Sequence, residues 1–452
     1  MQRVKRVVTG YLPDERPSFM KMVLFALQHI LVMFPATVLV ALLTGFHIST
    51  TIFASGFATL CFILVTKGKI PLYYGSSFSY IAAIVGITGA EYGTVASNNL
   101  IGEAQFGIMM SGLVSIGVGL LISKFGASKI ERILPPVVTG PIAMIIGLSL
   151  AGTALSQASG FGVNNPNGVT GFWIVSLVTL LGIIVFTVVF KKGVLSQLPI
   201  LFGILLGYVT ALIVDFGFGV DLIDYSNLLS NHFVSVPHFT LPIPSWAAVI
   251  SIMPIALATI PESTAHLYQL DLYINNLAKE KGVTRYEIES KLGLNLIGDG
   301  IGDIASALVG GPAGTNYGEN ISTMAITKNF SVWVLGSAAV ITMILAFITP
   351  LANLVYTIPQ PVIGGASIYL FGVIAAQGVA ILIEKKVDMF DSKNLGIIAV
   401  ILIVGLGGTY AFPNGSIPMF GANLPALAFA SILGILLNFG LSLISRSKVD
   451  NQ

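Results

Sequence analysis

Two glutamates, Glu262 and Glu319, are the residues whose placement says most about the chemistry of this chain. Both lie inside apolar stretches, in a sequence of which only 9% is charged. An ionised side chain near the centre of a bilayer costs roughly 2.5 to 3.5 kcal/mol on insertion scales. Two such carboxylates therefore require a water-filled cavity, a bound proton or a polar ligand, and a transported polar molecule meets that requirement best.

A histidine extends this pattern. His266 follows Glu262 by four residues, so the two share one helical face, and Glu319 begins a short apolar helix. If these groups converge, they offer two acceptor carboxylates, an imidazole and the backbone N–H groups near Phe78 and Gly318. That set fits a planar ligand with alternating N–H donors and C=O acceptors, and His266 is suited to exchange a proton near neutral pH. The alternative is a Glu262–His266 pair that only satisfies itself in a helix bundle, and the interrupted helix beside it favours the functional interpretation.

The composition predicts an all-α polytopic membrane protein. Hydrophobic residues make up 55% of the chain, which has 49 glycines, and its mean hydropathy is +0.89. Apolar runs of roughly 18 to 25 residues recur along it, each long enough to cross a bilayer. The predicted spans are Met22–Thr44, Thr51–Thr66, Phe106–Ser123, Pro135–Ala154, Phe172–Phe190, Leu198–Val214, Trp246–His266, Leu292–Val309, Val332–Tyr356, Val362–Ile383, Leu395–Leu406 and Ala426–Ser445. Two shorter candidates, 76–89 and 318–327, bring the total to about fourteen.

The two shorter candidates share an unusual pattern. Each begins with an extended stretch, Ile70–Tyr80 in one and Gly310–Asn320 in the other, and then becomes an apolar helix of about half a bilayer. They are the third and tenth spans, and a separation by an odd number of spans inverts the second half of the chain relative to the first. The sequence therefore predicts two inverted repeats of seven spans, with both half-helix N-termini offering N–H groups near the midplane.

The basic residues predict the orientation of the chain. With both termini in the cytoplasm, all 22 lysines and arginines fall in inner segments, as the positive-inside rule requires. These inner segments include the ones that carry Lys129, Arg132, Lys191 and Lys192, whereas the outer connections 89–103 and 215–241 contain no lysine or arginine. We therefore expect a multi-pass protein of the plasma membrane, without a cleaved signal peptide.

Several other classes of function are disfavoured. The single cysteine, Cys61, lies in an apolar run, which excludes intrachain disulfides and a thiolate metal cluster. The cations are spread over many loops rather than gathered on one face, which argues against binding of nucleic acid. Neither a cofactor nor a metal site is expected. His47, His232 and His238 lie in outer segments and are predicted to be solvated.

Polar residues in two other spans have more than one interpretation. Asp299 and Asp303 either bind a cation or hydrogen-bond to the interrupted backbone of the tenth span, and we favour the second. The run Gly300–Asp303 mimics the Gly-x-Gly-Asp of intramembrane aspartyl proteases, but no preceding span supplies a second catalytic aspartate. In the first span, Gln28 and His29 either line the cavity or bridge helices.

The segment Glu319–Lys328 resembles the signature of the nucleobase-ascorbate transporter family, also called the xanthine/uracil permeases. The resemblance covers nearly the whole chain. Its further matches are Leu27–His29 followed by Pro35–Val40, Lys67–Pro71 followed by Gly75–Phe78, and the pair Glu262 and His266. Within that family the chain is most similar to bacterial uracil permeases.

This resemblance implies a division into two domains. A core domain would comprise residues 1–133 (spans one to four) and 245–356 (spans eight to eleven). A gate domain would comprise residues 134–244 (spans five to seven) and 357–452 (spans twelve to fourteen). Members of the family often pair as homodimers and bind their substrate between core and gate, without covalent chemistry.

The resemblance also implies roles for individual residues. Glu262 and Glu319 would contact the base, the backbone N–H groups of Phe78 and Gly318 would meet its carbonyl groups, and His266 with Glu262 would couple proton movement to transport. The pocket would also be lined by Ala36, Tyr317 and Phe371. The supporting residues would be Ser77, Gln28, His29, Asp299 and Asn320.

The chain departs from the family pattern at three places. It has Ser322 where the signature usually has Gly, Phe371 where the uracil subgroup has a pocket Tyr, and Gly314–Asn316 where that subgroup has Asn-Thr-Thr. We expect a proton-coupled uracil symporter that works by alternating access, and sodium coupling stays open. A purine or xanthine carrier of the same family is the main alternative. An anion exchanger or channel of similar architecture comes next, and it would need a cation where Glu319 stands.

Overall fold

The computed structural model describes residues 10–126, 135–160, 166–190, 198–225, 232–419 and 422–449 of the chain. In these ranges regular structure is almost entirely helical, and ten helices are long and apolar enough to cross a membrane. They are α1 (Phe19–Thr44), α2 (Ile48–Val65), α4 (Asn98–Phe125), α6 with α7 (Pro136–Ser149 and Ala151–Ser159), α8 (Pro166–Val188), α10 (Pro199–Phe218), α11 with η2 and α12 (Trp246–Ile252, Met253–Ile255 and Ala256–Lys281), α17 (Gln360–Glu384), α18 (Ser392–Ala411) and α19 (Ala426–Val449). The predicted all-helical, multi-pass class is confirmed.

The remaining elements are shorter. They are β1 (Tyr74–Ser76), η1 (Phe78–Tyr80), α3 (Ile81–Thr88), η3 (Glu289–Lys291), α13 (Leu292–Leu308), β2 (Gly314–Asn316), α14 (Gly318–Thr327), α15 (Val332–Leu345), α16 (Thr349–Tyr356), η4 (Pro413–Gly415), β3 (Ser416–Met419) and β4 (Ala422–Pro425). The prediction of one unbroken span over Val332–Tyr356 is wrong, because α15 ends at Leu345 and the helix restarts as α16 at Thr349. Pro350 lies in the first turn of α16, where its missing N–H leaves no helical hydrogen bond unmade.

The two interrupted segments cross each other and pair. β1 and β2 are antiparallel neighbours, with Gly75 opposite Thr315. The pairing continues at both ends, where the Ser77 N–H donates to the Ala313 carbonyl at 2.9 Å and the Tyr317 N–H to the Tyr73 carbonyl at 3.0 Å. Lipid offers no hydrogen bonds, so irregular backbone at this depth is stable only when other protein groups satisfy it.

Glycines make this crossing possible. A Cβ atom on Gly75 would lie 2.4 Å from the Tyr317 ring, and one on Gly314 would lie 2.1 Å from the Tyr74 ring. Gly75 of β1 is thus covered by Tyr317, which follows β2, and Gly314 of β2 is covered by Tyr74 of β1. A side chain at either position would force the two strands apart.

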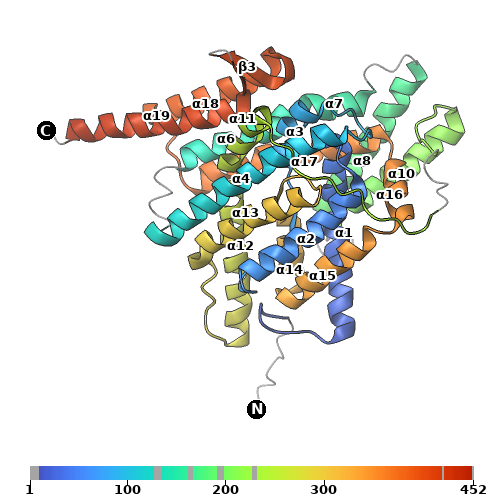
Figure 1. Cartoon of the computed structure of the whole chain (residues 1–452), viewed down its shortest axis with the longest axis horizontal. Helices are drawn as coiled ribbons and strands as arrows, with labels where there is room; N and C mark the ends of the chain where they lie inside the picture. The colour runs from blue at the N-terminus through green and yellow to red at the C-terminus, as the bar shows by residue number, and fades with distance from the viewer. Residues whose placement is uncertain are drawn as a thin grey trace.

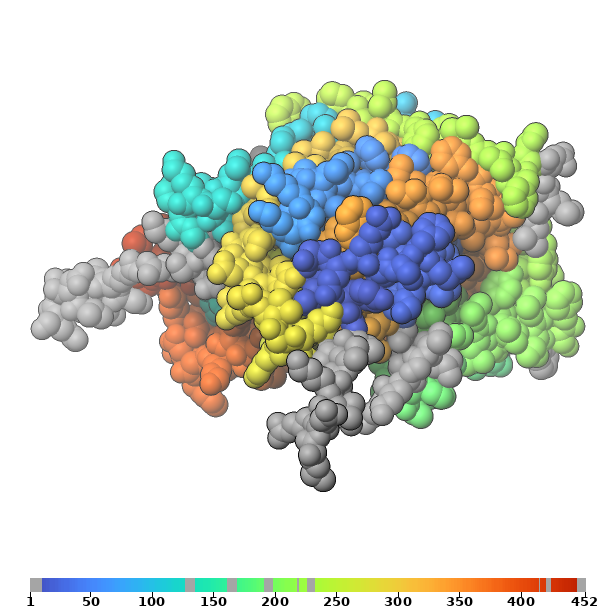
Figure 2. All heavy atoms as spheres, turned by 90° about the horizontal axis from the view of Figure 1, so that it is seen from below, coloured from blue at the N-terminus to red at the C-terminus, as the bar shows by residue number. Residues whose placement is uncertain are grey.

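The helices are arranged around this crossing. Figure 1 shows α18 and α19 reaching out to one side, α8 and α10 on the opposite side, and α1, α2, α14 and α15 between them. Seen from below, the blue α1 lies between the yellow α12 and the orange α15 (Figure 2). All residues of β1 and β2 are buried, so the crossing lies inside the helical body.

Ion pairs gather where the helices end in basic residues. Glu15, just before α1, pairs with Lys281 at the end of α12, and Glu280 pairs with Lys328 at the end of α14, each at 2.5 Å. These contacts put the ends of α12 and α14 beside the start of α1. The predicted inner residues Lys129, Arg132, Lys191 and Lys192 lie outside the described residues.

The prediction that His47 is solvated is wrong. Its ring is half-buried and lies 4.5 Å from the ring of His238, while His232 and His238 are exposed. The cause is the segment that leads to α11, which runs along the start of α2, where the Thr50 hydroxyl donates to the His238 carbonyl at 2.8 Å. Hydropathy could not reveal this cover, because it depends on two segments that are far apart in the chain.

Candidate substrate-binding site

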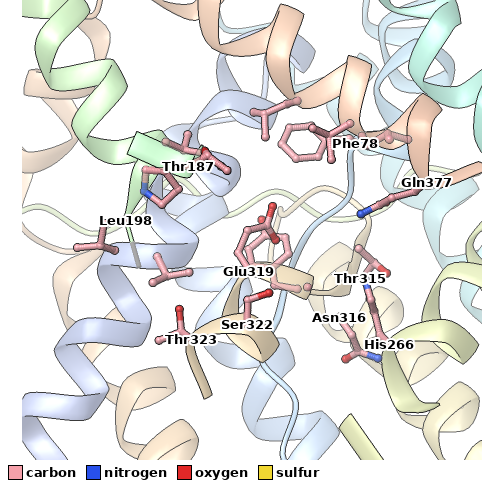
Figure 3. Close-up of a pocket in the computed structure, with 18 of the residues that line it drawn as sticks. Phe78, Thr187, Leu198, His266, Thr315, Asn316, Glu319, Ser322, Thr323 and Gln377 are labelled. Carbon is pink, nitrogen blue, oxygen red and sulfur yellow. The ribbon is translucent and has the colours of Figure 1, made fainter. Parts of the chain in front are cut away.

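A cavity of about 380 Å³ lies beside the crossing and contains both intramembrane glutamates. Figure 3 shows side chains reaching into it from several helices, with Glu319 near its centre. One wall comes from α1, α12, β2 and α14, and the facing wall comes from the end of α8, the start of α10 and the middle of α17. Among the residues that the structure describes, none of those that line it is a lysine or arginine.

The start of α14 presents Glu319 to the cavity. Tyr317 precedes the helix in extended conformation and Glu319 lies in its first turn, where N–H groups have no partner within the helix. Gly318 lines the cavity between them, and a Cβ atom there would lie only 2.9 Å from Nε2 of His266. Glycine is therefore needed at position 318 for His266 to approach this helix end.

Glu262 and His266 reach the cavity from α12, as the helical spacing predicted. The Ser79 hydroxyl donates to Oε2 of Glu262 at 3.4 Å, which connects α12 with the start of the other half-helix. His266 makes a hydrogen bond with the backbone of Asn316, while its Nδ1 is buried and has no hydrogen-bond partner in the described part of the chain. The three ionisable groups predicted from the sequence thus line one cavity.

Phe78 and Tyr317 also line the cavity, whereas Ala36 and Phe371 do not. Ala36 is buried in the adjoining apolar core, at 3% exposure. Phe371 is 2% exposed and packs edge-on against Phe78, with ring centroids 6.0 Å apart. Ser77 lies just behind Phe78, where its hydroxyl accepts from the Ser79 N–H at 3.3 Å.

A polar network supports the crossing from behind. The Asn316 amide donates to Oδ1 of Asp299 at 2.7 Å, and the Ser263 hydroxyl donates to Oδ2 of the same carboxylate. One oxygen of Asp303 accepts both the Tyr74 hydroxyl, at 2.6 Å, and the Gly314 N–H, at 2.8 Å. The favoured interpretation is confirmed for Asp303, which hydrogen-bonds to the interrupted backbone, whereas Asp299 bonds to side chains.

Asn320 ties α14 to α1. Its amide lies 3.0 Å from Nδ1 of His29 and donates to the His29 carbonyl at 3.2 Å. Both side chains are buried, and neither Gln28 nor His29 lines the cavity. Of the two interpretations left open for His29, the structure therefore selects the bridge between helices.

The cavity also contains polar residues that sequence reasoning assigned no binding role. Ser322 follows Glu319 by three residues on α14, Gln269 follows His266 by three residues on α12, and Gln377 enters from α17. The spacing of three residues could have found the first two, because it places a side chain on the same helical face as the acid or imidazole. Nothing local marks Gln377, since its position depends on how α17 packs against the rest.

Known proteins resemble this chain in sequence and in fold. A xanthine/uracil permease model, described as "Permease family", matches residues 20–414. The uracil permease of Bacillus caldolyticus is 38% identical over 434 residues, which cover 94% of this chain and 93% of that protein. The uracil permease of Escherichia coli K12 is 33% identical over 432 residues, which cover 95% of this chain and 92% of that protein.

Among solved structures, the murine Slc26a9 anion transporter in the inward-facing state has a TM-score of 0.66 at 12% identity, covering 96% of this chain and 69% of that one. The transmembrane domain of the cyanobacterial bicarbonate transporter BicA has a TM-score of 0.55 at 16% identity, covering 94% of this chain and 98% of that one. At these identities the likeness establishes the shared fold alone.

Proposed function

This chain belongs to the xanthine/uracil permease family of membrane transporters, and on that premise we propose that it imports uracil together with a proton by alternating access. The observation that carries the proposal is the pair of glutamates that line one cavity, in which no described residue is a lysine or arginine. Carboxylates in such a place need hydrogen-bond donors, and a nucleobase supplies them through its ring N–H groups.

The cavity offers the complementary groups as well. The first turns of η1 and α14 lie at the cavity through Phe78 and Gly318, and N–H groups in a first helical turn lack intrahelical partners. We propose that these N–H groups bind the carbonyl oxygens of the base while Glu262 and Glu319 accept its N–H donors. A flat ring with alternating donors and acceptors can bind the backbone N–H groups and the two carboxylates at the same time.

His266 is our candidate for proton coupling, together with Glu262. Its Nδ1 has no hydrogen-bond partner among the described residues, so protonation there would break no existing hydrogen bond. The imidazole stands beside Gly318 and hence beside the helix start that would hold the base. The substrate and the proton would thus bind to neighbouring groups, so that binding of one changes the affinity for the other. That dependence is the physical basis of coupling. Sodium would be the alternative coupling ion.

We further propose the domain arrangement that the family implies: two inverted repeats of seven spans, a core of 1–133 and 245–356, a gate of 134–244 and 357–452, and a homodimer in the plasma membrane with both termini cytoplasmic. The two half-helices and their antiparallel strands support the inverted repeats. The cavity wall facing the glutamates comes from α8, α10 and α17, all within the proposed gate. Transport would then be a rigid-body movement of the core against the gate.

The direction of the cavity supports an inward-facing state. Beyond Glu319 its lining continues to Ile326, close to Lys328, and on α17 it continues to Gln377, toward the basic pair Lys385 and Lys386. At the opposite end, the Tyr92 hydroxyl donates to the Ile358 carbonyl at 2.9 Å. That bond joins the proposed core to the start of the second gate segment and would keep the outer side closed.

A purine or xanthine carrier is the second candidate. It is favoured by Phe371, which stands beside the cavity where the uracil subgroup has a tyrosine. Ser322, which lines the cavity, departs from the signature of the whole family. An anion transporter is disfavoured, even though the solved structures of similar fold are named for anions, because carboxylates would face the ligand.

Uptake of radiolabelled uracil into proteoliposomes tests the proposal. We expect uptake to require an imposed inward proton gradient, to collapse when the gradient is removed, and to persist with excess unlabelled xanthine. Uptake that follows a sodium gradient instead would refute the proton part. No uracil uptake, with competition only among purines, would transfer the assignment to the second candidate.

A further inference from the structure

The cavity is larger than one pyrimidine base requires. Its volume of about 380 Å³ lies within the range of about 300 to 1,000 Å³ that is typical for drug-sized ligands. Uracil is a single small ring. If it lies at the glutamates and the half-helix ends, part of the cavity stays outside that site.

The polar side chains away from the glutamates include Gln269, Ser322 and Gln377. We call these three the amide ring after its two glutamines; Ser322 contributes a hydroxyl. Gln269 and Ser322 each lie three residues beyond a proposed site residue, or about 4.5 Å along the helix axis. α12 and α14 both run toward ends that carry lysines, and α17 likewise ends beside Lys385. The amide ring therefore lies on the basic-loop side of the glutamates, which is the proposed route to the cytoplasm.

Two members of the amide ring have free hydrogen-bonding groups. Ser322 and Gln377 are exposed to the cavity, and neither forms a hydrogen bond with another residue in the described ranges. Figure 3 shows Ser322 beside Glu319 on α14, and Gln377 extending into the cavity from α17. Gln269 donates to the Tyr273 hydroxyl at 3.2 Å, which leaves its carbonyl oxygen available.

The other hydroxyls on the facing wall are already engaged. Tyr369 donates to the Thr187 hydroxyl at 3.3 Å, and Thr187 donates to the Ile183 carbonyl at 2.7 Å. The neighbouring cavity residues from α10 and α17 are apolar: Leu198, Pro199, Ile200, Leu201, Leu370, Val373 and Ile374. Of the described residues on this wall, Gln377 is thus the one best able to bind a polar ligand.

We propose that Gln269, Ser322 and Gln377 form a second nucleobase subsite on the inward side of the glutamates, through which the base passes on its way out of the main site. This inference rests on the proposed function. An amide side chain offers one donor and one acceptor edge, which matches the N–H and C=O edge of a pyrimidine or purine base. Because the subsite has no charged group, it binds the base less tightly than the glutamates do and releases it more readily.

The subsite also depends on the conformation. Gln269 and Ser322 belong to the proposed core and Gln377 to the proposed gate, so movement of the core separates the three. The subsite is therefore complete only in one arrangement of the two domains. A base held there is committed to the side toward which the cavity opens.

Equilibrium binding of radiolabelled uracil to the purified full-length protein tests the proposal. We expect each protomer to bind one equivalent of uracil tightly and a second equivalent more weakly. Gln377→Leu and Ser322→Ala should each weaken the second equivalent about two- to tenfold, the effect of one lost hydrogen bond, while the tight equivalent changes by less than about twofold. Gln269→Leu, whose side chain is partly engaged with Tyr273, serves as a further variant. Thermal unfolding of each variant verifies that it is folded.

Matched controls lie away from the cavity on other helical faces. Asn276→Leu on α12 and Ser337→Ala on α15 change the same types of group and should leave both equivalents as in the unmodified protein. A single equivalent in the unmodified protein would overturn the proposal. A second equivalent that ignores both Gln377→Leu and Ser322→Ala would also overturn it, because the weaker site would then lie elsewhere.

Failure of the proposed function looks different. In that case the tight equivalent is missing as well, and Glu319→Gln has no uracil binding to remove. If the protein binds a purine instead, the titration is repeated with that purine. The proposal then again requires a second, weaker equivalent that Gln377→Leu and Ser322→Ala weaken.

Discussion

Replacing Glu319 with glutamine is the most direct test of the binding site. The substitution keeps the size of the side chain but removes its charge, and it puts an NH₂ group where the base is expected to present an N–H donor. Among the described residues, no lysine or arginine lines the cavity, and Glu319 takes part in none of the ion pairs. Its removal therefore breaks no internal contact of that kind, and the fold should persist.

The magnitude follows from the bond that is lost. A hydrogen bond to a charged group contributes about 1.5 to 3 kcal/mol, which corresponds to about a 10- to 150-fold loss of affinity. The donor–donor encounter with the new amide increases that loss, so the lower figure is a minimum. Stability should stay the same or rise slightly, because Glu319 acts electrostatically on Glu262 and that interaction between like charges disappears.

The assay is isothermal titration calorimetry with uracil on purified protein, combined with thermal unfolding. Glu280→Gln is a matched control, because that carboxylate pairs with Lys328 near the helix ends, outside the cavity. We expect it to leave uracil affinity unchanged. Unchanged affinity in Glu319→Gln, with the protein folded, would refute the assignment of this carboxylate to the base.

Three further variants test other parts of the reasoning. His266→Ala should impair uphill uptake more than binding, and accumulation that still follows the pH gradient normally would assign proton coupling to another group. Asp303→Ala leaves two buried donors unpaired at about 1 to 3 kcal/mol each, so the melting temperature should fall clearly; an unchanged value would contradict its role in holding the crossing. Tyr92→Phe removes the bond to Ile358 and should shift the population about two- to tenfold toward the outward-facing state. A cysteine introduced by Ile326→Cys, in a Cys61→Ser background, should then react more slowly with an impermeant reagent from the inner side, and an unchanged rate would show that the bond does not favour this state.

Local properties of the sequence determined the class of this protein and much of its site. Span length and hydropathy predicted a multi-pass helical protein, because the bilayer sets the length of apolar segment that can cross it. The cost of a carboxylate in lipid singled out Glu262 and Glu319, and the helical period put His266 on the same face as Glu262. Glycine and polar residues before short apolar runs marked the two interrupted segments, since such residues cannot continue an apolar helix.

Only the tertiary structure decided what each predicted residue touches. Ala36 and Phe371 lie behind the cavity rather than in it, His29 bridges to Asn320, and His47 is covered by the segment that leads to α11. Each of these outcomes depends on packing between segments distant in sequence, which hydropathy and helical period do not encode. Gln377 enters the cavity for the same reason. Local sequence patterns thus predict which chemical groups the site contains, whereas the packing of helices distant in sequence decides the shape of the cavity.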